Sequence, residues 1–259
     1  MKEYEINEQY AAMPEVKDFV QNLPTLFGAK GEKIFANGRN VLKMFVVKEG
    51  HPVLEKVVVK RFRARNIFQT LAYSTVTTSK AKRAFHNGLM LRQHGLCTPE
   101  PLAYVEERRG GMLHYCYYLS AFTDAKSVRT ALDIDFNKPM AQCFAKFIAK
   151  LHQHGMVHHD LNFGNVLYKE TSPLHYQISV IDINRLTYKN PKQLTLADCK
   201  DDFVRWTDRK DLLQYVIEEY AKARGLDQQS TLNQVMHLKA VHDRNWHRRK
   251  SFTRKLKKL

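Results

Sequence analysis

Short runs of β-branched and aromatic residues alternate with turn-forming residues in the first half of the chain. Three of these runs read GEKIFANG, VLKMFVV and KVVVKRF, and NGRN and KEGHP lie between them. Two more, PLAYVEE and MLHYCYYLSAF, flank the turn-forming ERRGG. Runs of this length and composition are typical of strands joined by tight turns. The pattern therefore predicts a small antiparallel sheet, with one main helix that Ser79 caps and Gly95 ends.

The second half of the chain changes to a helical pattern. Phe144, Phe147, Ile148 and Leu151 recur at the spacing of one buried helix face, and Gly155 follows them. NVLY and YQISVIDI predict two strands around a polar turn, and the chain from residue 201 onward is mostly helical in pattern. We therefore predict an α+β protein with a β-rich first domain over residues 1–122 and a larger, mostly helical second domain over residues 123–259.

Composition narrows the class of protein. The chain has 259 residues, 44% of them apolar, which is ordinary for a globular protein with a proper core. It has no run of about 18 apolar residues, and its first residues are polar rather than ordered like a signal peptide. The four cysteines form no CxxC pair. These features predict a cytoplasmic protein with reduced thiols.

The net charge of +16 is concentrated in two zones. Residues 57–99 contain eight Lys and Arg and no acid, and residues 237–259 contain nine Lys and Arg and one acid, Asp243. The rest of the chain carries equal numbers of positive and negative charges. Two basic zones on such a chain indicate a polyanionic partner, such as an anionic membrane surface, a phosphorylated glycan or nucleic acid. A solvated face and a frayed end explain the second zone equally well.

The segment HHDLNFGNVL carries the candidate chemistry. His158, Asp160 and Asn165 match the HxDLxxxxN pattern of protein-kinase-like catalytic loops. Phosphoryl transfer needs a carboxylate near the attacking hydroxyl and oxygen ligands for magnesium on the phosphate side, fixed in one rigid loop. Asp182, at the end of ISVIDI, and Lys60, at the end of VVVK, stand where that fold keeps a second magnesium ligand and a phosphate-binding lysine.

Together with DINR and HGLCTPEPLAYVE, the segment DLNFGNVL is similar to the lipopolysaccharide kinase (Kdo/WaaP-type) family. The resemblance covers roughly residues 34–225. It implies a two-lobed protein-kinase-like fold and ATP-dependent phosphorylation of a Kdo or heptose hydroxyl on a lipid-linked lipopolysaccharide precursor. It also implies a peripheral location at the inner face of the inner membrane. By the resemblance, Asp160 is the base, Lys60 binds ATP, and Asn165 and Asp182 bind Mg²⁺.

The chain departs from the protein-kinase pattern at several positions. Asn162 stands where kinases acting on Ser and Thr carry a lysine, and no APE follows Asp182. The helix that normally supplies a glutamate to the lysine contains no acid here. We therefore expect that, without nucleotide, Lys60 either turns to Asp182 or has no close acid, and that His86 or Asn87 faces the cleft. Asn184 occupies the position of the DFG glycine, and we expect it to adopt a left-handed backbone.

These departures leave other functions open. One is a pseudokinase that serves as a binding or scaffold module, and a less favoured one is a basic nucleic-acid-binding protein, although no base-reading motif is present. A metal site at His152, His154, His158 and His159 lacks acidic or thiolate partners at zinc spacing. The sequence does not identify the sugar, the hydroxyl or the oligomeric state.

Overall fold

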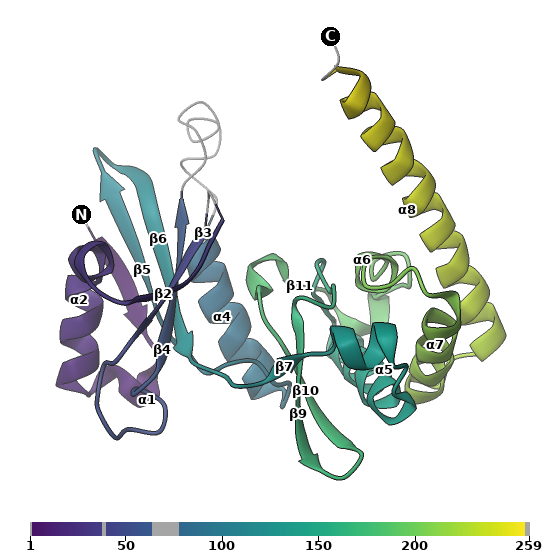
Figure 1. Ribbon diagram of the computed structural model, residues 1–259, viewed down its shortest axis with the longest axis horizontal. Helices are drawn as coiled ribbons and strands as arrows, with labels where there is room; N and C mark the ends of the chain where they lie inside the picture. Colours follow the sequence, from purple (N-terminus) through teal and green to yellow (C-terminus); the bar gives the residue numbers. More distant parts are fainter. Residues whose placement is uncertain (1, 38–39, 64–77, 257–259) are drawn as a thin grey trace. The chain divides into compact units, whose positions relative to one another are not determined.

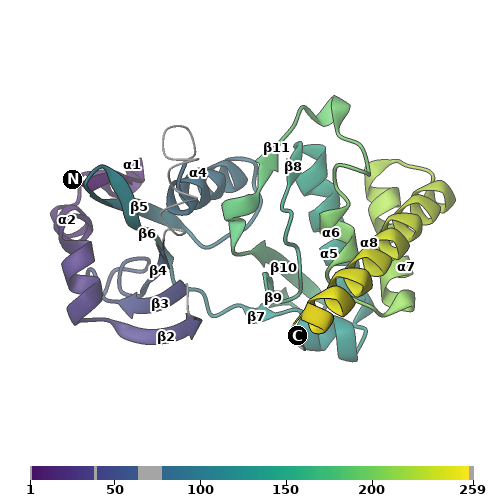
Figure 2. The ribbon, with the colours of Figure 1, turned by 90° about the horizontal axis from the view of Figure 1, so that it is seen from above.

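The computed structural model describes residues 2–37, 40–63 and 78–256, and it places side chains for all of these except 37 and 251–256. The chain forms two compact units, which are described separately below (Figures 1 and 2). The first unit contains Met1–Asp124 together with Asp182–Arg185. The second contains Ala125–Ile181 and Leu186–Leu259.

The first unit is built on an antiparallel sheet with the strand order β1-β5-β6-β4-β3-β2. Its strands are β1 (Lys2–Ile6), β2 (Glu32–Asn37), β3 (Asn40–Phe45), β4 (Val57–Arg63), β5 (Pro101–Arg109) and β6 (Met112–Ala121). The five strands from β2 to β6 follow the five runs predicted from the sequence, so that part of the prediction is confirmed.

Two helices pack on opposite faces of this sheet (Figure 1). Helix α2 (Pro14–Ala29) buries Val20 and Leu23 in one core with Val57 and Val59 of β4. Fully burying an aliphatic side chain of this size contributes about 1.5–3 kcal/mol. Because side chains alternate along a strand, Lys60 lies on the opposite face, the face on which α4 (Lys80–Gln93) packs.

Helix α4 begins and ends where the sequence predicts. The Ser79 hydroxyl accepts a hydrogen bond from the amide of Lys82 at 3.1 Å, which satisfies one of the first free N–H groups. At the other end Gly95 has a φ of +64°, and the amide of Leu96 bonds the carbonyl of Leu91. This left-handed glycine ends the helix in a Schellman-type arrangement.

The amino-terminal segment adds elements that the sequence analysis did not predict. Strand β1 pairs with β5 at the edge of the sheet, helix α1 (Glu8–Ala11) follows it, and α2 comes next. The Asn7 side chain caps α1 and also donates to the carbonyl of Pro101 at 2.9 Å. The strand is thereby attached to the sheet by both its backbone and the residue that follows it.

The second unit is mostly helical, as predicted. Its helices are α5 (Lys138–Gln153), α6 (Asp201–Val204), α7 (Lys210–Arg224) and α8 (Gln228–Leu256), with a π-helical turn (Thr130–Ile134) and a 3-10 turn (Pro191–Gln193). Its short strands are β7 (Lys126–Ser127), β8 (Met156–Val157), β9 (Val166–Ser172), β10 (His175–Val180) and β11 (Thr187–Tyr188). Helix α5 packs against α7 (Figure 1), and the antiparallel β9–β10 hairpin matches the predicted strand pair.

Helix α5 ends at a position where only glycine fits. Gly155 has a φ of +75°, and a Cβ built on it would collide with the carbonyl oxygen of Lys189. The amide of Lys189 in turn donates to the carbonyl of Gly155 at 2.8 Å. This close approach pairs β8 with β11 directly before the candidate loop. Across the described residues, no helix has the length and apolar character needed to span a bilayer.

Candidate active site

Lys60 and Asp182 form an ion pair within the first unit. The Nζ of Lys60 lies 2.8 Å from Oδ1 of Asp182, and their side chains are 18% and 32% exposed. The ammonium also lies 5.2 Å from the centre of the Phe62 ring, on the same face of β4. Of the two arrangements expected for Lys60, the structure shows the one in which it turns to Asp182. The pair is partly shielded from water, which strengthens it relative to a surface pair.

Asp182, rather than Asn184, has the left-handed backbone. Its φ is +60°, whereas the following residues Ile183–Arg185 form a 3-10 turn. The expectation for Asn184 was therefore wrong, because a 3-10 turn requires right-handed dihedrals. Asp is one of the few non-glycine residues that tolerate this conformation. The side-chain amide of Asn184 instead contacts the aspartate: its Nδ2 donates a hydrogen bond to Oδ1 of Asp182 at 2.6 Å.

Helix α4 holds this turn through two side chains on one face. Asn87 donates from Nδ2 to the carbonyl of Ile183 at 2.8 Å, and Arg83 donates from Nε to the carbonyl of Asn184 at 3.0 Å. Residues 83 and 87 are four apart, so they share a helix face. Sequence reasoning named Asn87 but missed Arg83, which looked like one cation among many in a basic stretch.

His86 turns to strand β1. Its Nε2 lies 3.0 Å from a carboxylate oxygen of Glu5 on β1, and its neighbour Lys82 pairs with Glu3 at 3.1 Å. Residues 82 and 86 share the helix face that turns to β1, whereas 83 and 87 occupy the face that turns to residues 183–184. Of the two residues named as alternatives, Asn87 turns to residues 183–184 and His86 does not. The sequence analysis left both open because it did not foresee β1 and its two acids.

Asp160 and Asn165 lie in one loop of the second unit, and the loop is tied to itself. The Nδ2 of Asn165 donates to the backbone carbonyl of Asp160 at 2.9 Å. Asn162 donates from its Nδ2 to Oδ1 of Asp160 at 3.3 Å and accepts from the amide of Gly164 at 2.9 Å. These contacts join residues no more than five apart in the chain, and they restrict the loop as Asx turns commonly do.

His158 joins this loop to the residue before Asp182. The amide of Asp160 donates to its Nδ1 at 3.3 Å, so the proton lies on Nε2, which donates to the carbonyl of Ile181 at 3.1 Å. The amide of Ile181 donates to the carbonyl of Asn165 at 3.0 Å. Both backbone groups of Ile181 are thus held by the loop, and Asp182 is the next residue in the chain.

Asp202 is a buried carboxylate under the loop that sequence reasoning missed. Its Oδ2 accepts from the amide of His158 at 2.7 Å, and its Oδ1 accepts from the amide of His159 at 2.7 Å, where φ is +63°. Burial alone would raise the pKa of Asp202, but the hydrogen bonds that it accepts from the His152 ring and the His158 amide outweigh this effect and hold the pKa below its usual value. Asp202 therefore remains ionised and fixes the two amides.

His152 extends the same buried network. Its Nε2 lies 3.3 Å from Oδ2 of Asp202, and its Nδ1 lies 3.0 Å from the hydroxyl of Tyr220. Burial lowers the pKa of His152, so the ring is neutral. Within the described residues, no group of three or more His, Cys, Asp and Glu is arranged to hold a metal ion. His152 and His158 instead bond an acid, a phenol and the backbone.

Asn165 and Asp182 carry side-chain oxygens of the kind that a hard cation prefers. The hydrogen bond from Asn165 Nδ2 leaves Oδ1 as the amide atom able to act as a metal ligand. Asp182 supplies a carboxylate, and carboxylate and amide oxygens together with waters and phosphates are the ligands that Mg²⁺ prefers. The residue types at these two positions fit magnesium rather than zinc.

Comparisons with known proteins bear on this arrangement. The sequence profile of the lipopolysaccharide kinase (Kdo/WaaP) family matches residues 31–200. Among solved structures, WaaP in complex with acyl carrier protein is similar, with a TM-score of 0.60 and 13% identity over 95% of this chain and 98% of that chain. The Rio2 kinase from Chaetomium thermophilum, in an ADP/Mg²⁺-phosphoaspartate complex, has a TM-score of 0.46 and 17% identity over 85% of this chain and 75% of that one. A search of curated proteins found no match.

The likeness to WaaP shows a protein-kinase-like fold, and at this low identity it shows the fold alone. The family match is independent of the fold comparison, and it includes Lys60, the loop from His158 to Asn165, and Asp182. The family consists of kinases, which transfer a phosphoryl group. Because the match covers more than half of the chain, this protein belongs to the lipopolysaccharide kinase (Kdo/WaaP) family.

Proposed function

We propose that the protein uses ATP to phosphorylate a sugar hydroxyl, on a Kdo or heptose of the lipopolysaccharide inner core. The acceptor is a lipid-linked precursor, and the protein works as a peripheral protein at the inner face of the inner membrane. The family match supports the reaction class. One observation supports the site most strongly: a single self-bonded loop carries Asp160 and Asn165 and holds both backbone groups of Ile181, directly before Asp182.

In this proposal each residue has one task. Asp160 accepts the proton of the attacking sugar hydroxyl, a role in which a positioned carboxylate contributes about 10²–10⁴-fold. Lys60 binds the phosphates of the nucleotide, and Asn165 and Asp182 hold Mg²⁺. When bound, magnesium offsets the negative charge that develops on the transferred phosphoryl group. Asn162 keeps the Asp160 carboxylate oriented through its hydrogen bond to Oδ1.

The ion pair between Lys60 and Asp182 takes the place of the lysine–glutamate pair of protein kinases. The ion pair keeps the Lys60 ammonium beside the carboxylate that we propose as a Mg²⁺ ligand before a nucleotide arrives. Asn184 gives the same carboxylate a second donor, and Arg83 and Asn87 hold the backbone beyond it. An acid on α4 is not needed for this arrangement, because amide and guanidinium groups position the turn through its carbonyls.

The charge of the second unit supports an anionic acceptor. Helix α8 exposes Arg244, Arg248, Arg249 and Lys250, and Trp246 among them is 49% exposed. Lys and Arg near an anionic membrane surface contribute about 1 kcal/mol each. We propose that the domain over residues 1–122 binds the nucleotide and that residues 123–259 carry the base and meet the acceptor.

A second candidate function is a pseudokinase that binds a nucleotide or a partner without turnover. The absence of any acid on α4 favours it. It predicts that the purified protein binds ATP at most and that loss of the gene leaves lipopolysaccharide unchanged.

The proposal is tested by phosphate transfer. The full chain is incubated with radiolabelled ATP, Mg²⁺ and a Kdo-bearing lipid A precursor, with the precursor lacking Kdo and heptose as the control. We expect label only in the Kdo-bearing lipid. We also expect the lipopolysaccharide of a deletion strain to lack one phosphate when it is analysed by mass spectrometry. Unaltered lipopolysaccharide together with no transfer would support the pseudokinase.

A further inference from the structure

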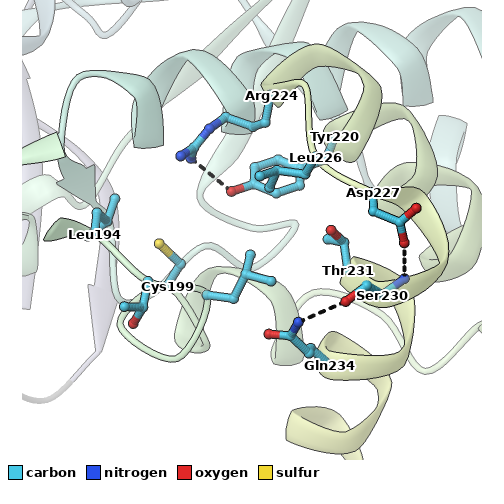
Figure 3. Close-up of a pocket in the computed structure, with 11 residues that line it drawn as sticks. Leu194, Cys199, Tyr220, Arg224, Leu226, Asp227, Ser230, Thr231 and Gln234 are labelled. Atoms are coloured by element: carbon cyan, nitrogen blue, oxygen red, sulfur yellow. Dashed lines mark hydrogen bonds between the residues drawn. The ribbon is translucent and has the colours of Figure 1, made fainter. Parts of the chain in front are cut away.

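A small pocket lies in the second unit between the end of α7, the first turns of α8 and residues 194–199 (Figure 3). Its volume is about 280 Å³, which by the share of liquid volume per molecule equals roughly nine waters. The nonpolar part of its lining includes Leu194 and Leu226. None of the residues that line it belongs to the loop proposed for phosphoryl transfer.

Arg224 is the cation of this pocket. It is partly buried, and its guanidinium donates to the hydroxyl of Tyr220 at 3.0 Å (Figure 3). In the described part of the chain, no carboxylate forms an ion pair with it. A guanidinium carries five N–H donors in a planar fork that matches carboxylate and phosphate oxygens. A partly buried guanidinium bonded to a neutral phenol is therefore suited to an oxyanion.

The opposite wall offers neutral polar groups. Ser230, Thr231 and Gln234 lie in the first turns of α8, and Gln234 donates to the Ser230 hydroxyl at 3.2 Å. Asp227 is the acid of the lining, and its Oδ1 accepts from the amide of Ser230 at 2.7 Å as the cap of α8. Hydroxyl and amide side chains of this kind bond the hydroxyl groups of a ligand.

We propose that this pocket binds a small hydroxylated oxyanion, with a carboxylate or phosphate group on Arg224 and hydroxyl groups toward Ser230 and Gln234. The pocket volume is slightly below the usual range for drug-sized ligands, about 300–1,000 Å³, so the ligand has only a few carbon atoms.

A chain of hydrogen bonds connects the pocket to the candidate loop, and in it each group donates to the next. Arg224 only donates, so the Tyr220 hydroxyl accepts from it and donates to Nδ1 of His152. The proton of His152 is then on Nε2 and points to Asp202, which holds the amides of His158 and His159. A ligand anion on the other N–H groups of Arg224 weakens the polarisation of its bond to Tyr220, and the change reaches the ring of His152.

Calorimetric titration of the full chain tests the site, with glycerate, glycerol 3-phosphate and inorganic phosphate as probes at constant ionic strength. We expect glycerate or glycerol 3-phosphate to bind the wild type more tightly than inorganic phosphate does. Arg224→Gln should weaken binding roughly tenfold or more, because a charge-assisted hydrogen bond is lost. Lys222→Gln removes the same charge two residues away, where Lys222 pairs with Glu219 outside the pocket, and should leave binding unchanged.

A second variant guards against a folding defect in Arg224→Gln. Gln234 is exposed at the rim, so Gln234→Glu preserves the fold while placing a negative charge beside the ligand, and it should also weaken binding. In nitrogen NMR of the wild-type protein, the bound ligand should shift the ring signals of His152. The same ligand should cause no such shift in Tyr220→Phe. Absence of binding by all three probes to the wild type overturns the proposal, as does undiminished binding in both Arg224→Gln and Gln234→Glu. Inorganic phosphate binding as tightly as glycerol 3-phosphate refutes recognition of the hydroxyl groups. No nucleotide or lipid acceptor is present, so the result does not depend on the proposed kinase reaction.

Discussion

Asn87 of α4 donates a hydrogen bond from Nδ2 to the backbone carbonyl of Ile183 at 2.8 Å, directly after Asp182. The helix that lacks an acid thus still contacts the turn that carries the proposed magnesium ligand. Asn87 contacts the backbone of the turn, so it fixes the position of the turn. It does not pair with the ammonium of Lys60, as the glutamate of protein kinases does.

Replacing Asn87 with alanine should destabilise this turn. The carbonyl of Ile183 would lose its donor in a partly buried place, which costs about 1–3 kcal/mol of unfolding free energy. His86→Ala on the other face of α4 removes an exposed pair with Glu5 and ring contacts with Phe85 and Tyr104, and we expect it to cost less, about 1 kcal/mol or below. Urea unfolding compares the two variants, and Mg²⁺-dependent nucleotide binding should weaken only in Asn87→Ala. Equal effects of the two substitutions would argue against the positioning role.

Gly155→Ala should disturb the segment that leads into the loop. Its φ of +75° is unfavourable for alanine, and the new Cβ would collide with the carbonyl oxygen of Lys189. Gly225 is a matched control, because its φ is +65° but nothing lies within 4 Å of a Cβ there. Gly225→Ala should cost only the backbone term, about 1–2 kcal/mol, and Gly155→Ala clearly more in thermal or urea unfolding. Similar costs would show that Lys189 moves aside freely.

The stability of the second unit should fall in mild acid because of His152. Burial lowers the pKa of His152, so below the ordinary histidine value the unfolded chain binds a proton that the folded chain does not. The stabilisation is therefore fully present above that value and is lost as pH falls. Between pH 7 and pH 5 this one group accounts for up to about 2 kcal/mol. In urea unfolding, the free energy of unfolding of His152→Gln should fall by that much less between pH 7 and pH 5 than the value for the wild type does. An equal fall in both proteins would contradict a neutral His152 ring in the folded state.

Removing residues 245–259 should weaken binding to vesicles that contain anionic lipids, more at low salt than at high salt. The truncation deletes exposed cations of α8 together with Trp246, whose ring lies 4.3 Å from the Lys250 ammonium. Exposed charges are screened beyond about 8 Å at physiological ionic strength, which gives the salt dependence. Flotation with neutral vesicles serves as the control. Unchanged binding to anionic vesicles at low salt would make this end a solvated helix only.

The sequence predicted the parts of the fold whose signals are local. Strand β4 is a run of β-branched residues, Ser79 caps α4, and the loop motif spans eight residues from His158 to Asn165. It did not predict β1, because KEYEI offers only two apolar residues, Tyr4 and Ile6, and all but one of its residues are exposed. Helix α2 did leave a signal, the spacing of Val16, Phe19, Val20 and Leu23, but Pro24 and Gly28 interrupt the pattern.

Long-range contacts account for what was missed in the candidate site. Asp202 lies 44 residues from His158 in the chain, and no pattern around DCKDDF marks one of its acids as buried. His86 and Asn87 are neighbours, and only the position of β1 decides which of them faces residues 183–184. The left-handed residue was assigned to Asn184 by analogy with glycine, whereas the 3-10 turn moves that conformation to Asp182.

The central claim is that Asp160 acts as the base in phosphoryl transfer to a lipid-linked sugar. The most direct measurement compares the rate of label transfer from ATP to the Kdo-bearing lipid for the wild type and Asp160→Ala, with nucleotide affinity and thermal unfolding measured on the same preparations. The account predicts at least about a hundredfold loss of turnover, with the fold and nucleotide binding retained. A folded Asp160→Ala protein that keeps most of its activity would contradict it.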